Sequence, residues 1–386
     1  MLTITNAIFL TLLCSCGFHL IPSKNWRARL WLVTFLSMLI VFAYYPLAAL
    51  IAAASGVYSW GVVRAAQFSK PIAKYGPFTI LFFLAAFSVN EIWVPTDPYS
   101  STLVQFGMSF YVLRLYLAMR TSINNRQPAG LEELLLIALF FPIFPAGPIC
   151  AQEAFTKSPL ADRPVMTNYL AGFLRIGMGM CALYIFSPIA GEMIEHLAKY
   201  SPKNEIDWPA MNFMSVYAVM LLNFLKLYAG FAGYTEIAIG LALFFGFQVP
   251  ENFRYPFLAT NIQNFWQRWH LSLSRFITNQ IYLPLMLSLR KPRLAIFLSF
   301  LLVGFWHNIN IQYLVWGLGH GLALVLYMTF SKNRKYIAVI SRTNRVFHIA
   351  ISWLLTMSLV SFLSTFANEA TFENSIAFAK ALVAPG

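Results

Sequence analysis

One histidine in this sequence has surroundings that suit acid–base chemistry. His307 ends an apolar run that begins after Arg293, and two amides, Asn308 and Asn310, follow it. A neutral imidazole in a polar pocket is a suitable general base near pH 7. Ionisable groups inside apolar segments are costly and are functional candidates for that reason. A structural histidine bonded to a backbone carbonyl is the alternative, and these residues alone do not decide between the two.

A second histidine, His270, lies in the stretch NFWQRWHLS at 264–272. If the stretch is one helix, Gln267, His270 and Ser274 share a face. A direct role in chemistry competes with the simpler reading of an interfacial histidine that anchors the helix.

A third histidine, His320, lies about nine residues into an apolar helix, in the stretch WGLGHG at 316–321. Its three neighbouring glycines allow another helix to approach closely. Packing is therefore favoured over catalysis for this side chain.

The residues with the right chemistry to contact a substrate fall mainly in the segment 248–292. This segment mixes aromatic, basic and amide residues, so it is too polar to face lipid and too aromatic for an ordinary loop. An interfacial amphipathic helix, or a buried one that lines a wet cavity, fits both facts. Two intramembrane charges, Arg114 and Glu236, are either substrate ligands or structural ion-pair partners. The substrate-binding candidates are Asn264, Trp266, Arg268, Trp269, Asn308, Arg114 and Glu236.

The elements that must position these residues are membrane helices. Hydrophobic residues make up 59% of the 386 residues and charged residues only 11%, whereas soluble domains carry about 25% charged residues. The net charge of +13 comes partly from short basic loops between apolar runs, such as Arg290-Lys291-Pro292-Arg293. This is the positive-inside pattern of membrane proteins, so the lipid bilayer, and not nucleic acid, is the expected partner.

Apolar stretches recur along the whole chain, and together they predict an all-α polytopic membrane protein. We expect about ten to twelve hydrophobic helices, with re-entrant or interfacial pieces around a central tunnel, in a single domain over 1–386. The expected spans are 2–21, 30–45, 47–63, 76–94, 102–119, 131–150, 168–190, 210–228, 231–247, 293–306, 311–330 and 346–366. No nucleophile elbow, P-loop or metal-spaced histidine motif occurs, so no metal site and no bound cofactor are expected.

Several sequence blocks in order resemble the bacterial alginate O-acetyltransferase branch of the membrane-bound O-acyltransferase (MBOAT) family. The resemblance is most specific over the core 227–321. The blocks are GYTEIAIG at 233–240, PENF at 250–253, YPFLAT at 255–260, NFWQRWH at 264–270, YLPL at 282–285, GFWH at 304–307 and WGLGHG at 316–321. Upstream, Phe141-Pro142 and the stretch AGPI at 146–149 resemble another block of the family. The chain departs from the family pattern at Thr278-Asn279 and at Asn308, where relatives carry Arg-Asp and glycine.

The resemblance implies that His307 is the catalytic histidine and that His270 is the other conserved one. It implies acyl transfer, with acetyl the expected group, from a cytoplasmic thioester such as acetyl-CoA or acyl carrier protein. The acceptor is a hydroxyl of an envelope polysaccharide or of an extracytoplasmic acyltransferase partner, and the location is the bacterial inner membrane. Two other hypotheses remain open: a proton-coupled transporter that uses His307, Glu236 and Arg114 as a relay, and a non-catalytic scaffold of a polysaccharide export complex.

Overall fold

The computed structural model describes residues 4–81, 98–155, 165–201, 205–331 and 344–383. Within these ranges the secondary structure is helical, apart from one isolated bridge between Tyr200 and Ile206. Two compact units are present: unit 1 contains Met1–Met180 and Gly233–Glu251, and unit 2 contains Cys181–Ala232 and Asn252–Gly386. The expectation of one domain over 1–386 stays a prediction.

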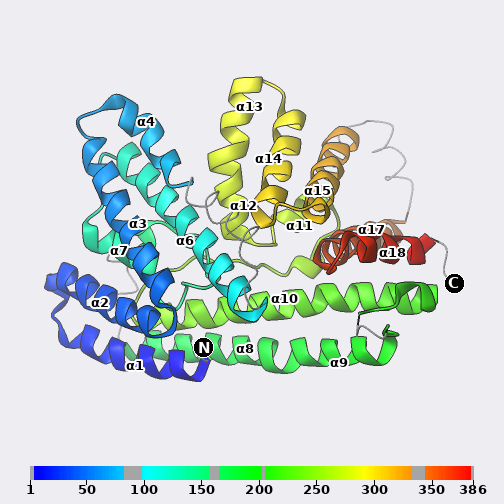
Figure 1. Ribbon diagram of the computed structural model, residues 1–386, viewed down its shortest axis with the longest axis horizontal. Helices are drawn as coiled ribbons and strands as arrows, with labels where there is room; N and C mark the ends of the chain where they lie inside the picture. The colour runs from blue at the N-terminus through cyan, green and yellow to red at the C-terminus, as the bar shows by residue number, and fades with distance from the viewer. Residues whose placement is uncertain (1–3, 82–97, 156–164, 202–204, 332–343, 384–386) are drawn as a thin grey trace. The chain divides into compact units, whose positions relative to one another are not determined.

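Unit 1 is a group of helices in which α3 contacts both α6 and α7, and α2 packs on α7 (Figure 1). A proline in the first turn begins both α3 and α4, where a missing N–H costs nothing. The helices are α1 Ile4–Leu20, α2 Trp26–Tyr44, α3 Pro46–Ala65, α4 Lys70–Thr79, α6 Pro98–Asn124, α7 Leu131–Leu139 and most of α8 Val165–Cys181.

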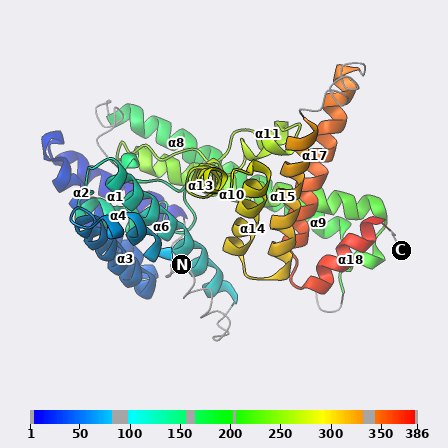
Figure 2. The same ribbon diagram turned by 90° about the horizontal axis from the view of Figure 1, so that it is seen from above.

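Unit 2 is built around the antiparallel pair α14–α15, which α17 covers on one side (Figure 2). Four of its helices lie within the segment 248–292 and four follow it along the chain. They are α9 Ser187–Leu197, the first part of α10 Phe213–Leu243, α11 Ile262–Trp266, α12 Leu271–Ile277, the π-helix η7 Thr278–Tyr282, α13 Leu283–Leu289, α14 Pro292–His307, α15 Ile311–Phe330, α17 Arg345–Asn368 and α18 Phe372–Val383.

The prediction of an all-α polytopic membrane protein is confirmed. The described ranges contain six helices long and apolar enough to cross a membrane, and two shorter apolar helices, one of which is α14. One expected boundary is wrong: the runs 210–228 and 231–247 belong to the single helix α10. Gly230 between them does not end the helix, because an isolated glycine inside a long apolar helix is tolerated when tertiary packing supports it.

Most of the expected span 76–94 lies outside the described residues.

Local sequence signals set the turn between α14 and α15. Pro292 occupies the first turn of α14, and the helix ends at His307 because Asn308 has extended backbone, with φ −163° and ψ 146°. Asn310 then caps α15, since its Oδ1 accepts a hydrogen bond from the Tyr313 N–H at 2.9 Å. The 16 residues of α14 rise about 24 Å, so His307 lies at the opposite end of this hairpin from Arg293.

Glycines bring α14 and α15 close together, as their sequence pattern predicts. A Cβ built on Gly317 would come within 2.6 Å of the Phe300 carbonyl oxygen in α14. On another face of α15, a Cβ on Gly319 would meet Leu363 of α17 at 2.6 Å. Small residues at such contacts are the usual way for membrane helices to pack tightly. The short distance between the backbones of α14 and α15 therefore determines how deeply the side chains of α15 are buried in unit 2.

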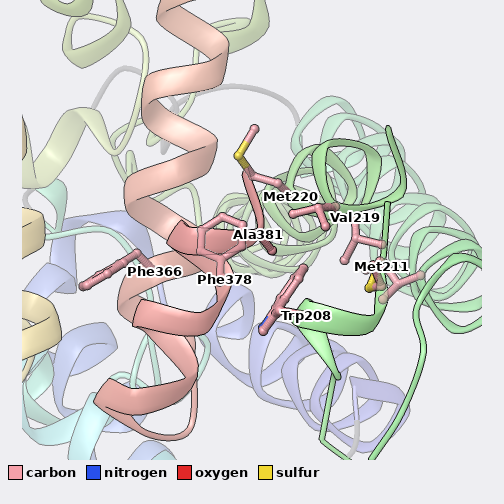
Figure 3. Close-up of a cluster of buried hydrophobic side chains, with 9 residues drawn as sticks. Trp208, Met211, Val219, Met220, Phe366, Phe378 and Ala381 are labelled. Atoms are coloured by element: carbon pink, nitrogen blue, oxygen red, sulfur yellow. The ribbon is translucent and has the colours of Figure 1, made fainter. Parts of the chain in front are cut away.

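The last helix, α18, closes one end of unit 2 with an aromatic cluster. Trp208 lies fully buried between α18 and the beginning of α10 (Figure 3). Its ring centroid is 4.8 Å from that of Phe378 in α18. This helix was not predicted, because its apolar residues form only a short amphipathic stripe whose partner surface comes from residues more than 150 positions earlier.

Replacing Gly317 by leucine is expected to destabilise the protein. The new side chain would meet the backbone of α14, which cannot yield as a flexible side chain does, and overpacking of this kind costs about 1–3 kcal/mol. Thermal unfolding in detergent should show a clearly lower Tm. Gly177→Leu is the matched control, because a Cβ at Gly177 meets nothing within 4 Å. Equal Tm values for the two variants would contradict this account of the helix contact.

Candidate functional site

His307 sits at the end of α14 among three aromatic side chains. Its ring stacks on Tyr313, with centroids 5.4 Å apart and planes at 25°. Trp316 meets it edge-on at 5.1 Å, and the neighbouring Trp306 lies at 4.7 Å. Aromatic contacts of this kind contribute about 0.5–1.5 kcal/mol each. These three rings therefore fix the position of the imidazole, and the His307 side chain remains partly exposed.

His320 lies one step deeper along α15, next to Trp316. The two ring centroids are 4.5 Å apart. Trp266 of α11 donates its indole N–H to His320 Nδ1 at 3.3 Å. An indole N–H is only a donor, so His320 must present an unprotonated Nδ1 and carries its proton, when neutral, on Nε2. The contact therefore fixes both the tautomer and the direction of the ring.

Five side chains thus form one continuous row in unit 2. They are held by α11, by the end of α14 and by one face of α15, and we call them the histidine–aromatic row. Its members, in order, are Trp266, His320, Trp316, His307 and Tyr313.

His270 reaches the site from a break between two helices, which the sequence did not predict. The expected continuous helix through 264–275 ends at Trp266 in α11 and begins again at Leu271 in α12. His270 between them has left-handed backbone, with φ 43° and ψ 57°. Such a conformation is costly for a non-glycine residue and persists only where its surroundings enforce it.

Hydrogen bonds to Asn252 hold this left-handed conformation of His270 in place. The Leu271 N–H donates to the Asn252 carbonyl at 2.8 Å, and the Ser272 hydroxyl donates to the Asn252 Oδ1 at 2.5 Å. The same break places the His270 ring edge-on to Phe231, with centroids 4.8 Å apart. The proposed shared face of Gln267, His270 and Ser274 is therefore wrong, because no helix continues through His270.

His270 remains neutral at physiological pH. Burial lowers its pKa, and the neighbouring His307 lowers it further. A neutral histidine can both donate and accept a hydrogen bond.

A cavity of about 480 Å³ lies on one side of the histidine–aromatic row. Trp266 belongs both to the row and to the wall of this cavity. The wall runs toward the end of the hairpin that carries Arg293, because it includes Ile296 of α14 and Met328 of α15. Polar side chains from α12 and the π-helix η7 complete it: Ser274, Arg275, Thr278 and Asn279.

A second, more polar pocket of about 450 Å³ borders the other end of the row. Asn368 at the end of α17 lines it, and the Tyr313 hydroxyl donates to the Asn368 Oδ1 at 3.3 Å. Phe231, which contacts His270, forms another part of its wall. The row that contains His307 therefore connects the walls of two hollows of different character, through Trp266 at one end and the Tyr313–Asn368 hydrogen bond at the other. The central tunnel expected from the sequence stays a prediction.

Among the substrate-binding candidates in the segment 248–292, Trp266 alone lines the 480 Å³ cavity. Asn264 accepts a hydrogen bond from Arg268 Nε at 3.0 Å, and Arg268 also donates to the Arg254 carbonyl at 3.2 Å. These contacts tie the α11 turn to the preceding loop. Trp269 stacks on Phe265 in an aromatic cluster, with centroids 5.5 Å apart. Their role in binding substrate stays a prediction.

Asn308 is exposed at the C-terminal end of α14, directly after His307. Its backbone N–H donates to the Gly304 carbonyl at 3.2 Å. Asn308 therefore follows the imidazole at the end of the helix, and its role in binding substrate stays a prediction.

Arg114 is fully buried in unit 1 and binds backbone carbonyls. Its guanidinium donates to the Phe110 carbonyl in its own helix at 3.3 Å, to Ile143 at 3.1 Å and to Phe144 at 3.4 Å. Tyr234 donates to Pro142 in the same turn at 3.1 Å. This geometry makes Arg114 a structural support of the turn after α7, which is one of the blocks that carry the family resemblance.

Glu236 has an ion-pair partner that the sequence reasoning missed. Arg175 of α8 donates to Glu236 at 2.8 Å and also forms a bidentate pair with Glu251. The signal was present as an arginine inside the apolar run 168–190. No described contact joins Glu236 to Arg114, so the two predicted members of a relay do not meet within unit 1.

Tyr313 and Trp316 are the site residues that sequence reasoning did not single out. Together with His320 they follow the spacing i, i+3 and i+7, which places them on one face of α15. That pattern was visible in the sequence, but its meaning depends on His307 lying opposite this face.

These features define a polytopic helical membrane protein with a histidine–aromatic row that connects the walls of two cavities. The sequence profile of the membrane-bound O-acyltransferase family matches residues 2–367. The chain therefore belongs to the membrane-bound O-acyltransferase family.

Individual relatives act on cell-envelope polymers, according to their names. The chain is 27% identical to the peptidoglycan O-acetyltransferase of Helicobacter pylori over 78% of this chain and 60% of that protein. It is 30% identical to the teichoic acid D-alanyltransferase of Bacillus subtilis over 64% of this chain and 67% of the relative. A protein of Pseudomonas fluorescens described as a probable alginate O-acetylase is also 30% identical, over 60% of this chain. The chain spans only 46% of that last relative.

Replacing Trp266 by phenylalanine should destabilise the histidine–aromatic row. Phenylalanine keeps an aromatic ring against Phe300 and Trp316 but leaves His320 Nδ1 without its donor. An unsatisfied buried polar atom costs about 1–3 kcal/mol, so the Tm in detergent should fall. Trp31→Phe, at a side chain that is 44% exposed, should have little effect. A Trp266→Phe protein as stable as the Trp31→Phe control would show that the hydrogen bond contributes nothing.

Proposed function

We propose that this protein is an O-acyltransferase that moves an acyl group, acetyl in the simplest case, from a cytoplasmic thioester to a hydroxyl outside the membrane. The observation that carries the proposal is the histidine–aromatic row, in which His307 lies between Trp266 on the wall of one cavity and Tyr313, which bonds Asn368 on the wall of the other. A base that serves two substrates arriving from opposite sides needs links of this kind to both cavities. Membership of the acyltransferase family supports the reaction type.

The 480 Å³ cavity is suited to the donor. It extends toward the basic turn 290–293, and basic turns favour the cytoplasmic side of a membrane. Its apolar wall, with Phe300 and Leu324, suits an acyl chain and its thioester arm, while Arg275 supplies a cation for a phosphate on the donor. Acetyl-CoA and acyl carrier protein both present this combination of groups.

The reaction needs one proton transfer and one displacement. A nitrogen of His307 removes the proton from the acceptor hydroxyl while that oxygen attacks the thioester carbonyl carbon. The C–O bond of the new ester forms, the C–S bond breaks, and the proton on the imidazole passes to the leaving thiolate. Tyr313 and Trp316 hold the imidazole in place, and His270 helps to orient the acceptor hydroxyl.

The acceptor is a hydroxyl of an envelope polysaccharide, or a hydroxyl on an extracytoplasmic partner that passes the acyl group on. The curated relatives named above include acyltransferases for peptidoglycan and teichoic acid, which supports an envelope polymer. This assignment places the protein in the bacterial inner membrane.

His307→Gln should abolish most acyl transfer. Glutamine preserves size and polarity but cannot accept the proton, and a general base contributes about 10²–10⁴-fold to the rate. The measurement is transfer of radiolabelled acetyl from acetyl-CoA in membranes, together with O-acetyl content of envelope glycans in cells that carry wild type, deletion or variant.

The two alternative hypotheses predict different results in the same strains. A scaffold leaves His307→Gln cells with normal O-acetylation while the deletion strain loses it. A transporter moves its substrate across vesicles that contain no thioester. His348→Gln is the matched histidine control, because His348 is partly exposed near the start of α17, at the opposite end of that helix from Asn368.

Arg275→Gln should selectively weaken the binding of the acyl donor. If Arg275 binds a donor phosphate, its loss raises the KM for acetyl-CoA about tenfold and leaves kcat little changed, because the interaction is equal in ground and transition states. Arg293→Gln is the control, since Arg293 is exposed and does not line the cavity. A fall in kcat with unchanged KM would place Arg275 in the chemistry instead.

A further inference from the structure

The turn between α13 and α14 carries three cations that the proposed chemistry does not use. Arg290, Lys291 and Arg293 are exposed at the end of a helical hairpin whose two arms pack against each other (Figure 1). In the part of the chain that the structure describes, none of the three forms an ion pair. We call these three residues the basic turn.

The sequence around the basic turn supplies no carboxylate that could neutralise it. Eleven lysine and arginine residues lie between Asn252 and Asn368, and no aspartate or glutamate lies among them. Cations gathered in this way repel one another and create a positive potential at the surface. The basic turn is therefore suited to an anionic partner from outside the chain.

The packing of α14 on α15 places the basic turn near the surface of the membrane. The helix α15 is long and apolar enough to cross a membrane. Its close contacts with α14 set Gly317 opposite Phe300 and Gly321 opposite Phe297. Continued along the two antiparallel helices, this register puts residues 290–293 within about two helical turns of Phe330, where α15 ends. The end of a membrane-spanning helix lies at the level of the lipid headgroups.

Exposed leucines flank the cations of the basic turn. Leu287 is 71% exposed, and Leu289 and Leu294 are also exposed. On α15, Leu322 and Leu326 lie at about the same level in this register and are exposed too. Cations next to exposed leucines are typical of segments in the membrane interface, because the leucines enter the acyl region while the long cationic side chains reach the headgroups.

We infer that the basic turn binds the headgroups of acidic phospholipids. Such a lipid supplies both an anion for the cations and acyl chains for the leucines. Arg290 and Arg293 can each bind phosphate oxygens through paired N–H donors. Because α14 also supplies Ile296 and Phe300 to the wall of the 480 Å³ cavity, the bound lipid holds that wall at the membrane surface.

Competition between two lipids measures this binding. The purified chain in detergent is mixed with equal amounts of phosphatidylglycerol and phosphatidylcholine that carry the same acyl chains, and the bound lipids are identified by native mass spectrometry. Wild type should retain phosphatidylglycerol at least tenfold more than phosphatidylcholine. Arg290→Gln/Arg293→Gln should lose most of this preference, because each cation near an anionic lipid surface contributes about fivefold. Arg290→Lys/Arg293→Lys should keep it.

Hydrogen exchange provides a local measurement with matched controls. In nanodiscs, phosphatidylglycerol should slow amide exchange in the segment 286–296 of wild type relative to phosphatidylcholine, and should not do so in Arg290→Gln/Arg293→Gln. Lys199→Gln/Lys380→Gln removes two exposed lysines outside the hairpin and should behave as wild type does. His307→Gln should also keep the lipid preference while it loses acyl transfer, so lipid binding and catalysis are tested separately.

Three results would overturn the inference. The first is equal retention of the two lipids by wild type, and the second is an undiminished preference in Arg290→Gln/Arg293→Gln. The third is an acidic acyl carrier protein that binds wild type but not this variant, with no lipid preference in either, which would assign the basic turn to a protein partner.

Discussion

Holding a neutral imidazole at a fixed position inside a helical membrane protein is the constraint on which the rest of unit 2 depends. Few strong hydrogen-bonding groups are available between apolar helices, so contacts between aromatic rings orient the imidazole instead. Tyr313 and Trp316 bracket His307, and Trp266 fixes the tautomer of His320 behind them. These contacts exist only because Gly317 lets α15 approach α14 closely.

The same constraint explains the broken segment between α11 and α12. A continuous helix would carry Trp266 and His270 on surfaces set by the helical repeat. The left-handed backbone at His270, held by Asn252, removes that restriction. Trp266 then reaches His320 while His270 faces Phe231. The conformational cost at one residue thus allows two side chains of a short stretch to serve the site independently.

Charge is used differently in the two units. In unit 1, Arg114 is occupied by carbonyl oxygens and Arg175 by two glutamates, so both act as internal supports. In unit 2, Arg275 and Lys226 face cavities. A cation enclosed by its partners holds a fold together, whereas one on a cavity wall can also meet a ligand.

The sequence by itself determined the class of protein and singled out His307 as the candidate base. Low charge, recurrent apolar runs and basic turns require membrane helices, and His307 with its flanking amides follows from local spacing alone. Tertiary structure decided which other residues belong to the site. The ring contacts of Tyr313, the pairing of Glu236 with Arg175 and the pocket around Lys226 join residues far apart in the chain. Helical periodicity specifies which face a side chain occupies, but only the packing of helices specifies what lies opposite that face.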